Sequence, residues 1–157
     1  MADSIQEQLM NQMVAQLSLI TTANGYSNTI ASVQRWNQGG VETIAVPTLV
    51  LKEGECTAEL SQSVFPSIKR RLTVEVIIIA LQDEADSRSG GEIINGLVAD
   101  VELAIAANRT WNGLAIMSDP PTYFEAELDA VMPHLAKGMR FEVVYEHLRH
   151  NPYEQAS

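Results

Sequence analysis

The fold is decided by residues 71–81, which read RLTVEVIIIAL. Apolar side chains recur at every second position of this run, as in a β-strand whose two faces meet different surroundings. One face carries Leu72, Val74, Val76 and Ile78. The other face begins polar and ends apolar, with Thr73, Glu75, Ile77 and Ile79. This change predicts a central strand whose second face is covered over only part of its length.

Two helices are predicted, and each begins with a capping box, in which a serine side chain accepts the amide hydrogen three residues further on. The first box is Ser4–Glu7, and apolar residues at helical spacing follow it toward a stop at Asn24-Gly25. This spacing predicts a helix of about five turns. The second box is Ser89–Glu92, and its helix is predicted to continue to about Ala107.

The remaining segments of alternating pattern predict further strands. Their expected ranges are 29–36, 43–52, 56–60, 114–118, 122–132 and 139–148. Lys52–Glu55 is expected to be a tight turn that joins the second and third of these strands into a hairpin. Two helices, each with a single apolar face, are enough to cover one side of a sheet. This predicts an α+β fold, in which a mainly antiparallel, mixed sheet carries the N-terminal helix and the second helix on one face.

The length of 157 residues fits a single domain, 1–157, in which residues 1–3 and 151–157 are expected to be flexible. The chain has 20 acidic and 10 basic residues, a formal net charge of -10. This balance argues against a protein that binds nucleic acid by neutralising phosphates, or one that binds anionic membranes. The longest purely apolar run, Val76–Leu81, is too short to cross a bilayer.

No catalytic motif stands out in the sequence. Loops typical of nucleotide-binding proteins, serine hydrolases and zinc proteases do not occur, so no catalytic or cofactor-binding residue and no enzyme activity is predicted. A single cysteine, Cys56, excludes a multi-thiolate metal site and favours a reducing compartment. The histidines are expected at the surface, because two ligands near a strand end do not complete a zinc site. They are His134, His147 and His150.

Three carboxylates alternate along the predicted strand 122–132: Glu125, Glu127 and Asp129. Converging carboxylates can hold Mg²⁺ and activate water, as in a nuclease or hydrolase, and the nearest lysine in sequence is Lys137. The favoured interpretation is a solvated strand face without a metal. A further interpretation is an acidic face that lines a passage and repels phosphates.

The one basic run is Lys69-Arg70-Arg71, at the entry of the central strand. It lacks the interleaved aromatic residues of a nucleic-acid patch, and such a run is typical of a solvated loop or of one side of a protein contact. A sheet with apolar residues on both faces, but with helices for only one, also favours association between copies of the chain.

The order of elements, together with particular residues, resembles the tail terminator proteins of long-tailed bacteriophages, and the likeness spans roughly residues 4–145. It is carried by Pro47 in an early strand and by the stretches Arg71–Val76, Ile94–Ala104, Trp111–Ala115 and Met139–Tyr145. The family is marked by this pattern and not by a catalytic motif, so the resemblance transfers no catalytic or ligand-binding residue.

The resemblance implies a structural protein of the virion tail and neck, assembled in the host cytoplasm. Six copies are expected to form a ring on the head-proximal end of the tail tube, where they stop tube growth and present a surface to the head–neck connector proteins. DNA would pass through the lumen without specific binding, which suits an acidic channel. Lys69, Arg70 and Arg71 are the candidate subunit or tube interface, and Glu125, Glu127 and Asp129 the candidate exposed or lumenal face. The alternatives are another neck or head–tail completion protein and a divalent-metal-dependent nuclease or hydrolase.

Overall fold

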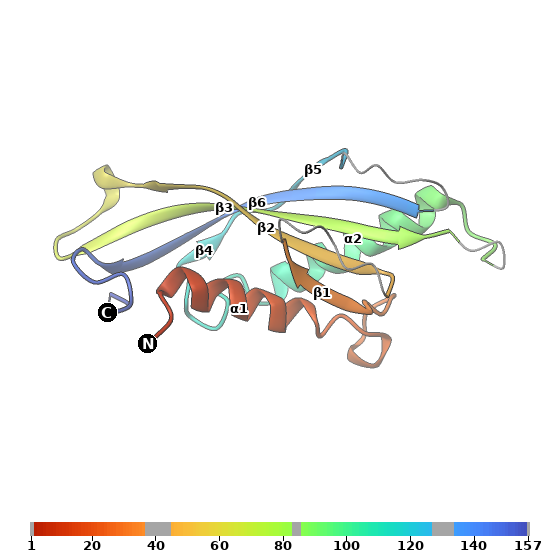
Figure 1. Cartoon of the computed structure of the whole chain (residues 1–157), viewed down its shortest axis with the longest axis horizontal. Coiled ribbons are helices and arrows are strands. Elements are labelled where there is room, and N and C mark those ends of the chain that lie inside the picture. Colours follow the sequence, from red (N-terminus) through yellow and green to blue (C-terminus); the bar gives the residue numbers. More distant parts are fainter. Residues whose placement is uncertain (1, 37–44, 83–85, 127–133, 157) are drawn as a thin grey trace.

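Two long antiparallel strands run the length of the protein in a computed structural model, which describes residues 2–36, 45–82, 86–126 and 134–156 (Figure 1). They are β3 (Ser67–Leu81) and β6 (His134–Leu148), each of 15 residues. Their pairing is continuous from Ser67 opposite Leu148 to Leu81 opposite His134. The strand predicted at residues 71–81 is therefore confirmed, and it begins four residues earlier than the alternation indicated.

The other strands extend this pair into a six-stranded mixed sheet of order β1-β2-β3-β6-β4, with β5 also on β6. Among the described strands, β1 and β2 pair in parallel and the other pairs are antiparallel. The predicted α+β class, a mixed sheet with two helices, is confirmed. The shorter strands are β1 (Ser32–Arg35), β2 (Thr48–Ala58), β4 (Met117–Ser118) and β5 (Thr122–Phe124).

The hairpin predicted around Lys52–Glu55 is wrong. Strand β2 continues through these residues, and a register shift between Glu53 and Cys56 marks a bulge against β3. A bulge accommodates residues that do not fit the ladder without ending the strand, and Gly54 suits it because a Cβ there would lie 3.3 Å from the Thr73 side chain. The real hairpin joins β2 to β3 through residues 59–66, which include the short 3-10 helix η2 (Leu60–Gln62).

Helices α1 (Ile5–Leu17) and α2 (Gly90–Ala107) lie on the same side of the sheet (Figure 1). Both capping boxes are confirmed, since Ser4 Oγ accepts from the Glu7 amide at 3.1 Å and Ser89 Oγ from the Glu92 amide at 3.2 Å. The second helix ends where it was predicted to end.

The first helix is shorter than predicted. It ends at Leu17, and a separate 3-10 turn, η1 (Thr22–Asn24), precedes Gly25, whose φ of +92° is left-handed. The β-branched run Ile20–Thr22 explains the early end, because such side chains lose rotamer freedom in a helix. The glycine stop is therefore real, but it terminates the short turn.

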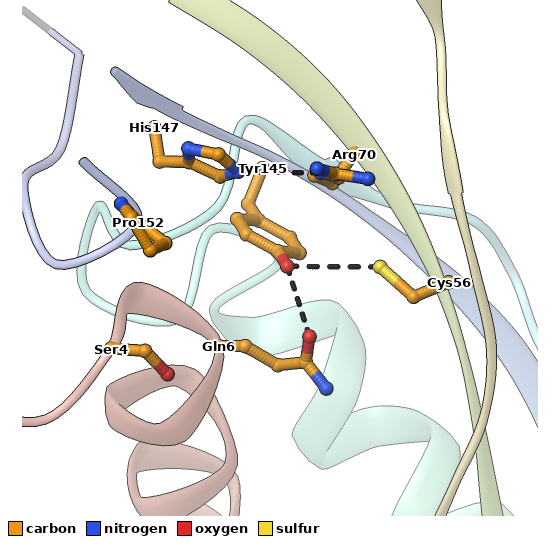
Figure 2. A pocket seen from close by; sticks show the side chains of 7 residues that line it. All are labelled: Ser4, Gln6, Cys56, Arg70, Tyr145, His147 and Pro152. Carbon is orange, nitrogen blue, oxygen red and sulfur yellow. Dashed lines mark hydrogen bonds between the residues drawn. The ribbon is translucent and has the colours of Figure 1, made fainter. Parts of the chain in front are cut away.

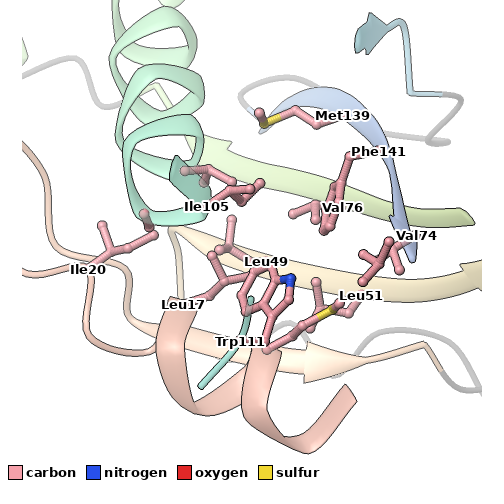
Figure 3. Packing of buried hydrophobic residues seen from close by; sticks show 14 of the residues in the cluster. Leu17, Ile20, Leu49, Leu51, Val74, Val76, Ile105, Trp111, Met139 and Phe141 are labelled. Atoms are coloured by element: carbon pink, nitrogen blue, oxygen red, sulfur yellow. The ribbon is translucent and has the colours of Figure 1, made fainter. Parts of the chain in front are cut away.

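The core lies between the helices and the face of the sheet that we call the helix face, which in β3 presents Leu72, Val74, Val76 and Ile78. Trp111 is fully buried in this core, where its ring stacks on Phe141 at a centroid distance of 6.0 Å (Figure 3). On the opposite face, which we call the outer face, Thr73 and Glu75 are half-buried whereas Ile79 is buried. Ile77 is half-buried as well, so the prediction of a central strand whose second face is covered over only part of its length is confirmed.

Both chain ends have contacts in the described part of the chain. The amide of Ile5 donates to Pro152 O at 3.0 Å, and the amide of Leu148 donates to Glu154 O at 3.0 Å. Whether residues 1–3 and 151–157 are flexible stays a prediction. No helix within the described residues is both long and apolar enough to span a membrane.

We expect Gly138→Ala to destabilise the protein by about 1–2 kcal/mol, because volume added at a closely packed position forces neighbours to move. Gly138 of β6 lies opposite Phe124 of β5, and a Cβ there would overlap the Phe124 ring. That ring also packs against the Arg140 guanidinium, at 4.9 Å from the ring centroid, so its displacement would break a second contact. Urea denaturation measures the change.

The matched control is Gly91→Ala, in the exposed first turn of α2, where an added Cβ meets nothing nearer than 3.9 Å. Alanine is the better helix former, so this variant is expected to gain about 0.5–1 kcal/mol. If both variants were stabilised alike, the packing of Phe124 on Gly138 would be contradicted.

Candidate functional site

The basic run is divided between the two faces of the sheet. Lys69 and Arg71 lie on the outer face, and Arg70 lies on the helix face, near the first turn of α1. Lys69 faces Glu146 across the strand pair, with Nζ and Oε1 3.8 Å apart. The three residues therefore do not form one patch.

Arg71 is held by three carboxylates from three separate segments. Its Nε donates to Glu59 at 2.9 Å, and its Nη1 donates to Asp119 at 3.0 Å and to Glu142 at 2.8 Å. These hydrogen bonds, first that to Glu59, raise the pKa of the guanidinium above its ordinary value. Arg71 thus ties the β2–β3 hairpin, the segment after β4 and strand β6 together, and its Nε and Nη1 donors are already engaged.

Arg70 makes a different contact, with His147. Its Nε donates to His147 Nε2 at 3.2 Å, and His147 Nδ1 lies 2.7 Å from the carbonyl oxygen of Leu148. Because Nε2 accepts, the proton must be on Nδ1, where it is donated to that carbonyl. Both ring nitrogens of His147 are therefore hydrogen-bonded.

The prediction that the histidines lie at the surface is wrong for His147, which is buried. Strand β6 ends at Leu148, as predicted, and the alternation that buries Val143 and Tyr145 also places the His147 side chain on the helix face, opposite Ile68. His150, just beyond the strand, is exposed as predicted. The side chain of His134 lies outside the described residues. No group of three or more potential metal ligands occurs in the part of the chain that the structure describes.

Arg70 and His147 border a pocket of about 290 Å³ between the first turn of α1 and the sheet (Figure 2). The Tyr145 hydroxyl lies between these elements, where it donates to Gln6 Oε1 at 3.1 Å and lies 3.7 Å from Cys56 Sγ. The pocket is lined by Ser4, Gln6, Cys56, Arg70, Tyr145, His147 and Pro152. The sequence does not predict this pocket, because its lining residues come from four segments that are distant in the chain.

Because of Tyr145, we expect the protein to become less stable at alkaline pH. Burial, and then the contact with Cys56, raise the pKa of its hydroxyl above the ordinary value of 10.0. The folded state therefore favours the protonated phenol, and this contribution is complete below about pH 10 and is lost as the pH rises toward the folded-state pKa. The loss is at most about 1.4 kcal/mol per pH unit.

Tyr145→Phe removes this titration, so we expect the variant to lose less stability than the wild type between about pH 8 and about pH 11. At neutral pH it should be less stable by about 1 kcal/mol, because Gln6 loses its donor. Urea midpoints at both pH values test this. Equal pH dependence of variant and wild type would contradict the role given to Tyr145.

The predicted acidic face is described only in part. Glu125 is exposed, at 86% of its side-chain area, and accepts a bond from Lys137 Nζ at 2.8 Å. Glu127 and Asp129 lie outside the described residues. The expected strand 122–132 corresponds to β5, Thr122–Phe124, in the described part. The structure thus brings Glu125 to the lysine that is nearest in sequence.

Large apolar side chains are exposed at the turn of the β2–β3 hairpin, residues 59–66, which we call the hairpin tip. Leu60, Val64 and Phe65 are 65%, 75% and 72% exposed. The tip projects beyond the N-terminal end of α1 (Figure 1). Most of this segment lies between the strands expected at 56–60 and 71–81. The signal available in the sequence was the pair Val64-Phe65, since apolar side chains outside a strand or helix have no buried face to occupy.

Comparison with known proteins assigns no function. No protein-family model matches the chain. A search of curated proteins also found no match. The function is therefore inferred from the residues of the chain itself.

Proposed function

We propose that the protein is a tail terminator of a long-tailed bacteriophage. In this proposal several copies, six by the resemblance, form a ring on the head-proximal end of the tail tube. The ring stops the addition of tube subunits and offers the head–neck connector proteins a surface for attachment. The protein assembles in the host cytoplasm, remains in the tail and neck of the virion, and acts without catalysis.

The hairpin tip is the observation that carries this proposal. A monomeric protein seldom exposes neighbouring large apolar side chains, and those that do so usually bury them against a partner. The tip is held in place by strands of 11 and 15 residues, so its position relative to the sheet is fixed. A rigid projection with an apolar end suits docking to another subunit better than it suits binding a small substrate.

The charge balance supports the same proposal. A ring of this chain multiplies a formal charge of -10 by its number of subunits. Like charge along a channel keeps DNA phosphates from binding to its wall, so DNA can slide through. The exposed Glu125 is one carboxylate that such a wall could present.

Electron microscopy of the purified full-length protein, labelled and mixed with tail tubes of its own phage, tests the proposal. A ring at one end of each tube, together with arrested elongation, is the expected result. Protein found only at the connector would instead identify another neck or head–tail completion protein.

No association with any particle would contradict an assembly role. The carboxylate alternative then predicts divalent-dependent hydrolysis of nucleic acid. Because the Glu125–Lys137 pair is the described part of that candidate site, Glu127→Gln and Lys137→Gln are both expected to abolish such activity.

A further inference from the structure

Arg70 differs from its neighbours in how little of its guanidinium is used. Arg71 is bonded to three carboxylates, and Arg140 of β6 pairs with Glu75 at 2.8 Å. Within the described residues, the Arg70 side chain makes no ion pair, and its one hydrogen bond is from Nε to His147 Nε2. Its two Nη groups therefore keep their donors, at the edge of the pocket.

His147 holds this guanidinium in place. The imidazole is buried, and its own proton is donated to the Leu148 carbonyl, so the acceptor Nε2 has a fixed position. Binding Nε to a fixed acceptor restricts the rotation of the planar fork and leaves the Nη pair available side by side. That geometry matches the two oxygens of a carboxylate or phosphate group.

The surroundings of the pocket favour an anion over a cation. The first turn of α1 borders it through Ser4 and Gln6 (Figure 2), and the start of a helix carries a partial positive charge. Of the carboxylates on the adjoining elements, Glu7 of α1 and Glu53 of β2 both bind Arg35, whose single positive charge offsets part of theirs. Among the residues that line the pocket, Arg70 supplies the positive charge.

We propose that this pocket is an oxyanion site, which binds one carboxylate or phosphate group through the Nη pair of Arg70. Its volume of about 290 Å³ is at the lower end of ligand pockets, so it suits a single head group or an acidic side chain and not a nucleotide. This inference does not depend on the proposed tail function.

Isothermal titration calorimetry of the full-length protein with sodium phosphate, and separately with sodium acetate, tests the site at an ionic strength kept constant with sodium chloride. The wild type is expected to bind at least one of the two saturably. Arg70→Gln should weaken binding by at least about tenfold, since two charge-assisted hydrogen bonds are lost. Arg70→Lys keeps the positive charge but loses the planar pair of donors, so its affinity for the anion should lie between those of the wild type and Arg70→Gln.

Arg149→Gln is the matched control, because this exposed arginine lies 5.9 Å from the Phe65 ring, outside the pocket lining. It should bind the anion as the wild type does. Absence of saturable binding by the folded wild type would overturn the proposal, as would equal weakening by Arg149→Gln and Arg70→Gln. Arg70→Lys serves the same comparison if Arg70→Gln does not fold.

Sedimentation with and without saturating phosphate identifies the source of the anion. If phosphate and Arg70→Gln each reduce self-association, the natural occupant is a carboxylate of a second copy. If association is unchanged while phosphate binds, the occupant is a dissolved anion. Either result supports an oxyanion site.

Discussion

Replacing Trp111 by alanine is expected to destabilise the protein by about 3–5 kcal/mol, the usual cost of removing a large aromatic side chain from a core. Trp111 is fully buried and stacks on Phe141, so its removal leaves a cavity between the sheet and the helices. A chain of this length typically has only about 5–15 kcal/mol of stability. The variant should therefore lie close to its unfolding transition at physiological temperature.

The indole also anchors the segment after α2. Its Nε1 donates to Ser118 Oγ at 2.7 Å, and that hydroxyl donates to the Arg109 carbonyl at 2.9 Å. Alanine removes this connection to β4 together with the ring. Trp111→Phe keeps most of the side-chain volume but leaves Ser118 Oγ without its donor. This variant is therefore expected to lose about 1–3 kcal/mol of stability.

Urea denaturation followed by circular dichroism measures both changes, with Trp36→Ala as the control. Trp36 is 48% exposed and contacts Lys52, whose Nζ lies 5.2 Å from its ring centroid. Its replacement is expected to cost less than about 1 kcal/mol, since exposed cation–π contacts contribute little. Equal losses for the two tryptophans would contradict the position of Trp111 at the centre of the core.

The parts of the fold that sequence predicted are those encoded by neighbouring residues. The alternation in residues 71–81 and the two capping boxes act within a few positions, and all three are confirmed. The tight turn expected at Lys52–Glu55 failed because pairing with β3 outweighs the local turn preference of a glycine between charged residues. A strand partner of 15 residues is a tertiary feature that no local pattern contains.

The candidate sites show the same limit. The run Lys69–Arg71 is contiguous in sequence, but a strand places alternate side chains on opposite faces, so the structure separates Arg70 from the other two. Their acceptors, Glu59, Asp119, Glu142 and His147, come from other segments. The pocket at Arg70 likewise requires α1, β2, β3 and β6 to be assembled, and it could not be located before the topology was known.

The separation of these arginines also changes how the proposed assembly should be tested. Charge reversal of Arg70 and Arg71 would be the direct test of the subunit or tube interface expected at the basic run. Reversal of Arg71 would place a fourth carboxylate among Glu59, Asp119 and Glu142, and the resulting repulsion would destabilise the monomer itself. Failure of that variant to assemble would therefore not identify an interface, whereas residues that the monomer leaves exposed provide a cleaner test.

The double variant Val64→Ser, Phe65→Ser is expected to abolish the capping of tail tubes while the monomer remains folded. Both side chains are largely exposed in the isolated chain, so their removal should change its stability by less than about 0.5 kcal/mol. If they are the apolar anchors of an interface, their loss should cost about 2–4 kcal/mol of binding free energy. That cost corresponds to binding about 30- to 700-fold weaker.

Leu103→Ser is the matched control, because Leu103 is an apolar side chain of α2 that is 56% exposed and lies far along the chain from the hairpin tip. Binding of each variant to tail tubes is measured by co-sedimentation, and its folding by thermal unfolding. If the tip variant capped tubes as the wild type does, the tip would not be the docking surface. If Leu103→Ser alone lost binding, the apolar surface that docks would be the exposed face of α2, and the partner would approach the helices instead of the end of the sheet.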